Sequence, residues 1–195
     1  MKPVVFLACL VPLARLVARV VAGRLGANPA EFLEHATGDW TLRFVILTLC
    51  VTPLRRIPGL NPLIRFRRML GLFAFFYGCL HVATYLTFDL VFDLRGLWAD
   101  VMKRRYITAG FTGFVLMIPL AVTSTAGWVR RLGGRRWAAL HRAIYGTAVA
   151  GVVHYVWLVK SDIRVPLAYA AVVAILLAWR VRTCLAGTGR SAAAR

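Results

Sequence analysis

Acidic side chains are scarce in this chain of 195 residues, which has 7 Asp and Glu against 25 Lys and Arg. Charged residues make up only 16% of the chain, whereas hydrophobic residues make up 60%. A typical soluble domain has about 25% charged and about 45–50% apolar residues. The composition therefore excludes an ordinary soluble domain and indicates a small integral membrane protein.

Several motifs of common enzymes are also missing. The four cysteines form no CxxC or CxxCH pattern, which argues against covalent haem, an iron–sulfur cluster and a disulfide framework. The chain has no Walker sequence, no GxGxxG in a strand–helix context, no HExxH and no plausible Ser–His–Asp arrangement. A nucleotide site and a hydrolase are therefore not expected.

Long apolar runs predict the architecture. A membrane-spanning helix needs about 20 mainly apolar residues, and six candidates follow one another along the chain: 3–22, 40–56, 69–90, 107–125, 141–159 and 166–182. We expect an all-α integral membrane protein, a bundle of six transmembrane helices. Residues 1–185 are predicted to form a single transmembrane domain, and 186–195 are predicted to form a disordered tail.

The arginines and the acids occupy alternate connections between these spans. Stretches 55–68 and 128–142 each hold five arginines and no acid, and further arginines follow the last span. All seven acids lie in or beside 23–39, 89–106 and 160–165. By the positive-inside rule the arginine-rich connections are cytoplasmic, as are both termini. The net charge of +18 is therefore attributed to orientation, and no nucleic-acid partner is predicted.

Two of the four histidines fall within the predicted spans. His81 follows Arg68 by thirteen positions and His154 follows His141 by thirteen, which is roughly 20 Å along a helix in each case. Spans three and five run in the same direction, so both imidazoles are expected at one depth in the outer half of the membrane. This pattern indicates two axial ligands of one b-type haem iron, although an interhelical hydrogen bond is the simpler role of a single buried histidine.

The other two histidines lie near the predicted membrane boundaries. His141 opens span five at the level of Arg67 and Arg68, so these three residues are candidates for a second haem or for propionate contacts. Thirteen positions turn a straight helix about 140° away from a repeat, which argues against His141 facing the same side as His154. His35 is predicted to lie in an outer loop, as a surface or capping residue, with quinone contact as an alternative.

Several ordered blocks resemble the MsrQ family (also called YedZ) of haem-binding membrane subunits. The blocks are HATGDW at 35–40, VTPLRR at 51–56, RFRRMLGLFAFFY at 65–77, KRRYITAGF at 103–111, TSTAGWVRRLG at 123–133, RWAALHRAIY at 136–145 and HYVWLVK at 154–160. The chain is also similar to the ferric-reductase-like transmembrane domain, whose fuller members carry paired histidines on the equivalent two helices. Here Arg67 and Arg68 stand where a fourth haem histidine would be expected.

The resemblance implies a role that the residues alone do not supply. Members of this family pass electrons from the quinone pool, with FMN as a further cofactor, through haem b to a periplasmic molybdopterin-containing subunit. That subunit reduces methionine sulfoxide in oxidised proteins. The expected protein is an electron-transfer subunit of the bacterial inner membrane without stand-alone substrate chemistry. Two alternatives remain: a ferric-chelate reductase, and a small transporter or scaffold that uses its histidines for packing or proton transfer.

Overall fold

The computed structural model describes the backbone of residues 1–192 and the side chains of residues 1–186, and every element in it is helical. The helices are α1 (Lys2–Val21), α2 (Pro29–Leu54), η1 (Asn61–Phe66), α3 (Arg67–Phe88), α4 (Leu94–Lys103), α5 (Arg105–Val122), α6 (Ala126–Leu132), α7 (Gly134–Leu140), α8 (Ala143–Leu158) and α9 (Arg164–Ala192). The predicted all-α class is confirmed. The predicted tail 186–195 extends beyond the described residues and stays a prediction.

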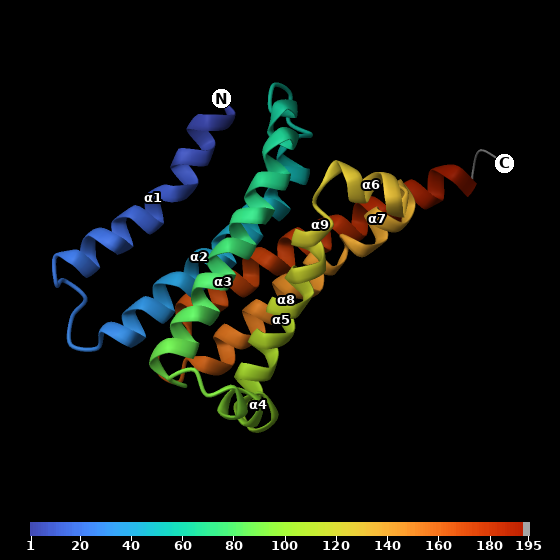
Figure 1. Cartoon of the computed structure of the whole chain (residues 1–195). Coiled ribbons are helices and arrows are strands. Elements are labelled where there is room, and N and C mark those ends of the chain that lie inside the picture. Colours follow the sequence, from blue (N-terminus) through green and yellow to red (C-terminus); the bar gives the residue numbers. More distant parts are fainter. Residues whose placement is uncertain (193–195) are drawn as a thin grey trace.

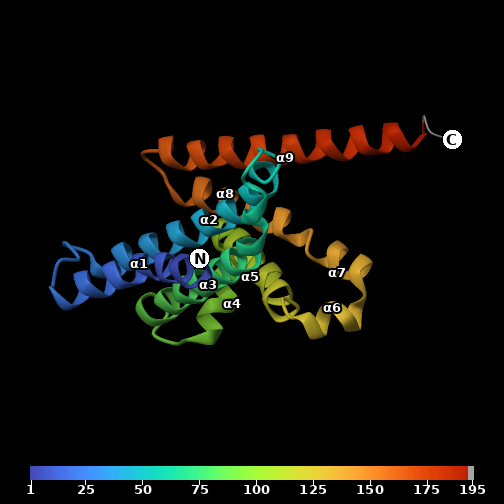
Figure 2. The same ribbon diagram turned by 90° about the horizontal axis from the view of Figure 1, so that it is seen from above.

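Two closely packed helix pairs form the centre of the molecule. Helix α2 packs along α3, and α5 packs along α8, while α9 runs back along α8 and α2 (Figure 1). Helix α1 packs mainly on α2 and α3, and the view from above shows it on the opposite side of the bundle from α9 (Figure 2). The alanines at the crossings, Ala74 of α3 and Ala148 of α8, are fully buried. Small residues at such positions let helix backbones approach closely.

Four predicted spans, 3–22, 69–90, 107–125 and 141–159, coincide closely with α1, α3, α5 and α8. Helix α2 begins at Pro29, eleven residues before the predicted span 40–56, and so extends into the predicted connection 23–39. Asn28 caps this helix by accepting a hydrogen bond from the Glu31 amide at 3.3 Å, and proline at the first helical position favours a helix start. His35 consequently lies on α2 and not in the predicted loop.

Besides the 3-10 helix η1, the connections hold three short α-helices within the described residues that hydropathy alone did not predict. Helix α4 occupies the predicted connection 89–106, where the Asp93 side chain accepts a hydrogen bond from the Arg95 amide at 2.9 Å. Helices α6 and α7 occupy 126–140, and Gly133 between them has φ +73°, a conformation that favours glycine. Such helices are set by caps and by tertiary contacts, which a search for long apolar runs does not detect.

Four helical segments are long and apolar enough to cross a membrane: Lys2–Val21, Asn61–Phe88, Arg105–Val122 and Arg164–Ala186. Helix α8 has 16 residues, about 24 Å, which is less than the hydrocarbon thickness of about 30 Å. Helix α2 carries Glu31, Glu34 and Asp39 in its first half and Arg43 just beyond its middle. The six-helix prediction requires that α2 and α8 also cross the membrane, and these two crossings stay a prediction.

The charged connections gather at opposite ends of the bundle. One end, here called the arginine-rich end, carries residues 55–66, the α6–α7 segment and the last turns of α9 (Figure 1). The other, the acid-bearing end, carries residues 22–28, 89–104 and 159–163. This is the separation that the sequence predicts, and it supplies a reference for locating the site.

Helix α1 is joined to α3 through one tyrosine. The Tyr77 hydroxyl accepts a hydrogen bond from the Leu13 amide at 3.0 Å and donates one to the Cys9 carbonyl at 2.9 Å. These two backbone groups stand four residues apart, so in a regular helix they would bond to each other. The hydroxyl is therefore inserted into the hydrogen-bond ladder of α1, beside Pro12.

Candidate functional site

His81 of α3 and His154 of α8 face each other between the two helix pairs. Their ring centroids lie 6.0 Å apart, and the ring planes are inclined at 72°. The two residues are 73 positions apart in the chain (154 minus 81), so the fold and not local sequence brings the rings together. The structure thus places at one level the two imidazoles that the sequence places at equal depth.

Each imidazole uses one ring nitrogen for a backbone carbonyl. His81 Nδ1 lies 3.0 Å from the Glu34 carbonyl oxygen of α2, and His154 Nδ1 lies 2.7 Å from the Tyr106 carbonyl oxygen of α5. A carbonyl oxygen can only accept, so both Nδ1 atoms donate and the unprotonated nitrogen of each neutral ring is Nε2. Within the described residues neither Nε2 atom has a hydrogen bond. This arrangement leaves Nε2 of each neutral ring chemically able to bind a metal.

Glycines open the space that the rings occupy. A Cβ atom built on Gly38 would lie 3.1 Å from His81 Cε1, and one built on Gly110 would lie 2.7 Å from His154 Nδ1. Gly38 stands four residues after Glu34, and Gly110 stands four residues after Tyr106. The two helix pairs therefore hold their histidines in the same way: a carbonyl at one position and a glycine one helical turn later.

A cavity of about 220 Å³ lies beside the two rings, between α2, α3, α5 and α8. Its wall is mostly apolar, and five glycines contribute to it: Gly38, Gly78, Gly110, Gly113 and Gly151. The bond between a metal and an imidazole nitrogen is about 2.0–2.1 Å long, so two such nitrogens on opposite sides of one ion lie about 4 Å apart. Rings whose centroids are 6.0 Å apart can meet this requirement when their Nε2 atoms point inward.

The donor set further restricts the kind of metal. Among the described residues, no group of three or more His, Cys, Asp or Glu side chains could hold a metal ion. Two imidazoles alone leave most coordination positions of a transition metal unfilled. The site therefore fits a metal that brings its own equatorial ligands into an apolar cavity.

Carboxylates line the cavity toward the acid-bearing end. Glu34, Asp39 and Asp89 are among the lining residues, and Glu34 Oε1 is buried with no hydrogen-bond partner within the described residues. Glu34 precedes the predicted span 40–56. Burial, with the nearby charges of Asp89 and Glu31, raises the pKa of Glu34 to about 7. His35 is exposed, as the sequence predicts, and it also lines the cavity.

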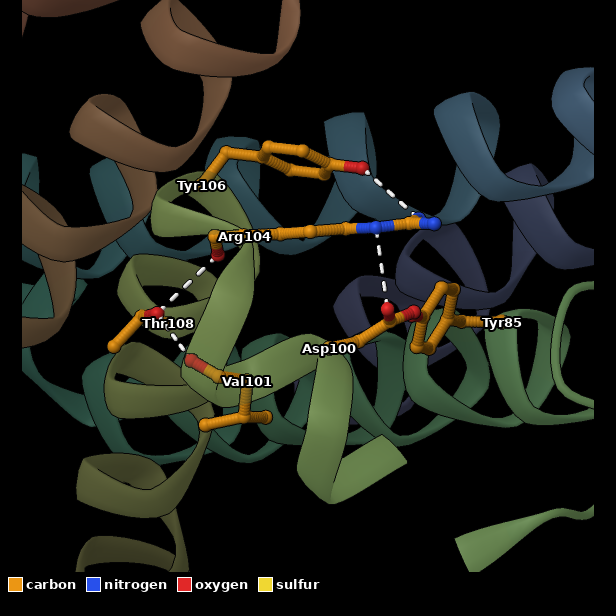
Figure 3. A network of polar contacts seen from close by, with 6 residues as sticks. All are labelled: Tyr85, Asp100, Val101, Arg104, Tyr106 and Thr108. Atoms are coloured by element: carbon orange, nitrogen blue, oxygen red, sulfur yellow. Dashed lines mark hydrogen bonds and ion pairs between the residues drawn. The ribbon is translucent and has the colours of Figure 1, made fainter. Parts of the chain in front are cut away.

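Helix α4 contributes Leu97 to the wall of the cavity, and polar contacts join it to neighbouring helices (Figure 3). Asp100 accepts a hydrogen bond from the Tyr85 hydroxyl and pairs with Arg104 Nε at 3.1 Å. The Thr108 hydroxyl of α5 donates to the Val101 carbonyl. Tyr85 and Tyr106 also line the cavity, so the network connects α4 to the wall that supports His154.

His141, Arg67 and Arg68 lie elsewhere, toward the arginine-rich end. His141 Nε2 is 3.0 Å from the Thr123 hydroxyl, and the Trp137 ring stacks on the imidazole with centroids 3.9 Å apart. Arg67 lines a separate small pocket with Tyr145 and Arg180, and Arg68 is exposed. None of the three is among the residues that line the two-histidine cavity. A role for them at a second haem stays a prediction.

Comparison with known proteins identifies the family. The family model described as "Ferric reductase like transmembrane component" matches residues 37–152, from the first third of α2 to the middle of α8. No solved structure matches the chain. The helical bundle, the paired histidines and this match define the class: a ferric-reductase-like transmembrane protein.

Its curated relatives share one name, "Protein-methionine-sulfoxide reductase heme-binding subunit MsrQ". The relative from Herminiimonas arsenicoxydans is 51% identical over 96% of this chain and 91% of its own length. That from Rhodospirillum rubrum is 51% identical over 91% of this chain and 85% of its own, and that from Ralstonia nicotianae is 54% identical over 91% and 82%. The chain belongs to the MsrQ family.

Proposed function

We propose that the chain binds haem b in the cavity beside His81 and His154, with these two side chains as axial ligands of the iron. The observation that supports this most directly is the pair of facing rings, 6.0 Å apart, whose Nδ1 atoms are held by carbonyls and whose Nε2 atoms are unpartnered within the described residues. The relatives' printed name, a haem-binding subunit, supports the same cofactor.

Bound haem supplies a reversible one-electron change between ferric and ferrous iron. The residues of the chain hold and insulate it. The Glu34 and Tyr106 carbonyls fix the tautomer and the orientation of the two imidazoles. Gly38 and Gly110 let the rings lie against α2 and α5. Apolar side chains such as Leu42, Phe114 and Met117 line the cavity and exclude water from it.

The proposed role is that of an electron-transfer subunit of a methionine-sulfoxide reductase system in the bacterial inner membrane. Six helices cross the membrane, and the arginine-rich end and both termini are cytoplasmic. Electrons enter from the quinone pool, with FMN as a further cofactor, and leave to a periplasmic molybdopterin-containing catalytic subunit that repairs oxidised proteins. The position of the histidine pair nearer the acid-bearing end supports outward delivery.

An absorption experiment tests the haem assignment. We expect the purified protein to show b-type bands in a dithionite-reduced minus oxidised spectrum, and His81→Ala and His154→Ala each to abolish or severely alter them, because each removes an axial ligand. Wild-type spectra in both variants would contradict the assignment. His141→Ala serves as the comparison: partial loss with one haem retained would point to a second haem near His141, Arg67 and Arg68.

The two alternative functions give different outcomes in the same preparation. A colourless protein expressed with ample haem would favour a transporter or scaffold. A haem protein that reduces ferric chelates without any partner subunit would favour a ferric-chelate reductase. For the proposed subunit, haem oxidation should instead depend on the methionine-sulfoxide-reducing partner.

A further inference from the structure

A small pocket at the arginine-rich end is distinct from the two-histidine cavity. It lies where α2, α3, α8 and α9 converge, and its polar lining comes from Thr52, Arg67, Tyr145 and Arg180. The remaining wall includes the apolar side chains of Leu49, Leu176 and Trp179. The enclosed space is about 10 Å³, about the space of one water molecule. A larger ligand could therefore place only one small group at the mouth and must keep the rest outside, along the helices.

The pocket concentrates positive charge that no side chain neutralises. Arg67 and Arg180 are half-buried, and Arg180 and Arg55 are both close enough to Arg67 to act on it electrostatically. The ion pairs within the described residues are Arg43–Asp39 and Arg104–Asp100, which use other arginines. A half-buried guanidinium beside like charges is costly unless an anion joins it. The arrangement therefore requires an anionic partner from outside the chain.

Aromatic rings hold the arginines in place. The guanidinium of Arg180 lies over the Tyr145 ring, 6.0 Å from its centroid, and that of Arg56 lies over the Trp179 ring at 4.8 Å. Such cation–π contacts fix the direction of a planar donor group at little cost in conformational entropy. Trp179 is also typical of the membrane interface, where lipid headgroups lie.

We propose that Arg67 and Arg180, assisted by Arg55, bind the phosphate group of an anionic phospholipid. Guanidinium groups form paired hydrogen bonds with phosphate oxygens, and basic pockets between membrane helices bind acidic headgroups. The small enclosed space admits a phosphate oxygen only, and the apolar side chains of α2 and α9 next to it suit acyl chains. The proposal does not rest on haem binding.

Native mass spectrometry of the full chain in detergent tests this site with phosphatidylglycerol as the probe and phosphatidylcholine as the neutral comparison. We expect wild-type protein to retain phosphatidylglycerol preferentially. Arg67→Gln and Arg180→Gln should each weaken its binding about tenfold, since each removes charge-assisted hydrogen bonds. Arg65→Gln and Arg182→Gln are matched controls, because these exposed arginines lie two residues from the first pair, and they should change binding less than about twofold.

Three outcomes would overturn the proposal. Equal losses of phosphatidylglycerol binding in all four variants would show that the lipid is attracted to the positive charge of this end in general and not to the pocket. Displacement of the lipid by inorganic phosphate at low millimolar concentration would make the ligand a soluble phosphate compound. Loss of haem with unchanged lipid binding in Arg67→Gln would assign the arginine to a haem propionate. The haem count per chain, measured on the same samples, separates these results from a failure of the proposed electron-transfer function.

Discussion

At the scale of single residues, His81 and His154 divide their two ring nitrogens between structure and chemistry. The Nδ1 atoms are bound to carbonyls of α2 and α5, and we propose that the Nε2 atoms bind the haem iron. Ligand histidines in proteins are commonly oriented through the second nitrogen, and loss of such a partner lowers metal affinity about 10–100-fold. The carbonyls on the Nδ1 side of each ring thus determine the direction in which its Nε2 atom points.

Replacement of Gly110 by alanine should disturb the site without removing a ligand. The new Cβ would lie 2.7 Å from His154 Nδ1, so the ring must move away from the Tyr106 carbonyl. We expect haem affinity to fall about 10–100-fold, measured by haem titration of the purified protein. Gly134→Ala is the control, because nothing lies within 4 Å of its added Cβ. Equal haem affinity in both variants would refute this account.

The sequence predicts the two histidines but not the groups that orient them. The histidines stand out because an imidazole inside an apolar run needs a partner, and helix rise gives their depth. Their carbonyl partners lie 47 and 48 residues away, and any residue type supplies a carbonyl. Gly38 and Gly110 each stand four residues after a carbonyl partner. This repeated spacing acquires a meaning only when the packing of α2 on α3 and of α5 on α8 is known.

At the scale of helices, long apolar runs fixed most of the element boundaries, and polar caps and tertiary contacts fixed the rest. Helix α2 extends well before its predicted start because Asn28 and Pro29 begin a helix among polar residues. Helix α4 forms between two spans and is held by Asp100 through Tyr85 and Arg104. Neither feature raises hydropathy, so neither was predicted. The same applies to the contact between α1 and α3, which depends on one hydroxyl group.

Removal of that hydroxyl should loosen α1. Tyr77→Phe keeps the buried ring and loses both hydrogen bonds to α1. We expect the free energy of unfolding to fall by about 1 kcal/mol, measured by titration with a denaturing detergent, while the haem spectrum stays unchanged, because Tyr77 does not line the cavity. Thr87→Val is the control, since this exposed hydroxyl bonds only to its own helix. A Tyr77→Phe variant as stable as wild type would show that the hydroxyl contributes nothing.

At the scale of the whole molecule, the distribution of charge and the pairing of helices agree. The arginine-rich and acid-bearing ends stand at opposite ends of the same bundle (Figure 1), as alternate connections of a membrane protein require. Helix α8 has only 16 residues, and neither α2 nor α8 is among the four segments that are long and apolar enough to cross a membrane. Each of them nevertheless belongs to one of the two closely packed pairs. Their contacts with α3 and α5 supply the apolar surroundings that their own length or composition lacks.

Reporter fusions can decide the number of crossings. With six crossings, fusions after Leu60 and Gly133 report the cytoplasm, and a fusion after Trp98 reports the outer side. If only the four longest apolar helices crossed, all three assignments would be reversed, whereas the C-terminus would be cytoplasmic in both cases. We expect the six-helix pattern, because a reversal would carry the five arginines of 55–68 outward. Alkaline phosphatase activity at each position measures the result.

The hydroxyl that joins α1 to α3 also bears on the order of assembly. Tyr77 is synthesised 64 residues after Leu13, and until then the Leu13 amide and the Cys9 carbonyl can bond to each other within α1. Docking of α3 exchanges that one bond for two through the hydroxyl, so the Leu13 amide and the Cys9 carbonyl are paired both before and after the step. Helix α1 can therefore enter the bilayer first and be added to the bundle late, as a separable part.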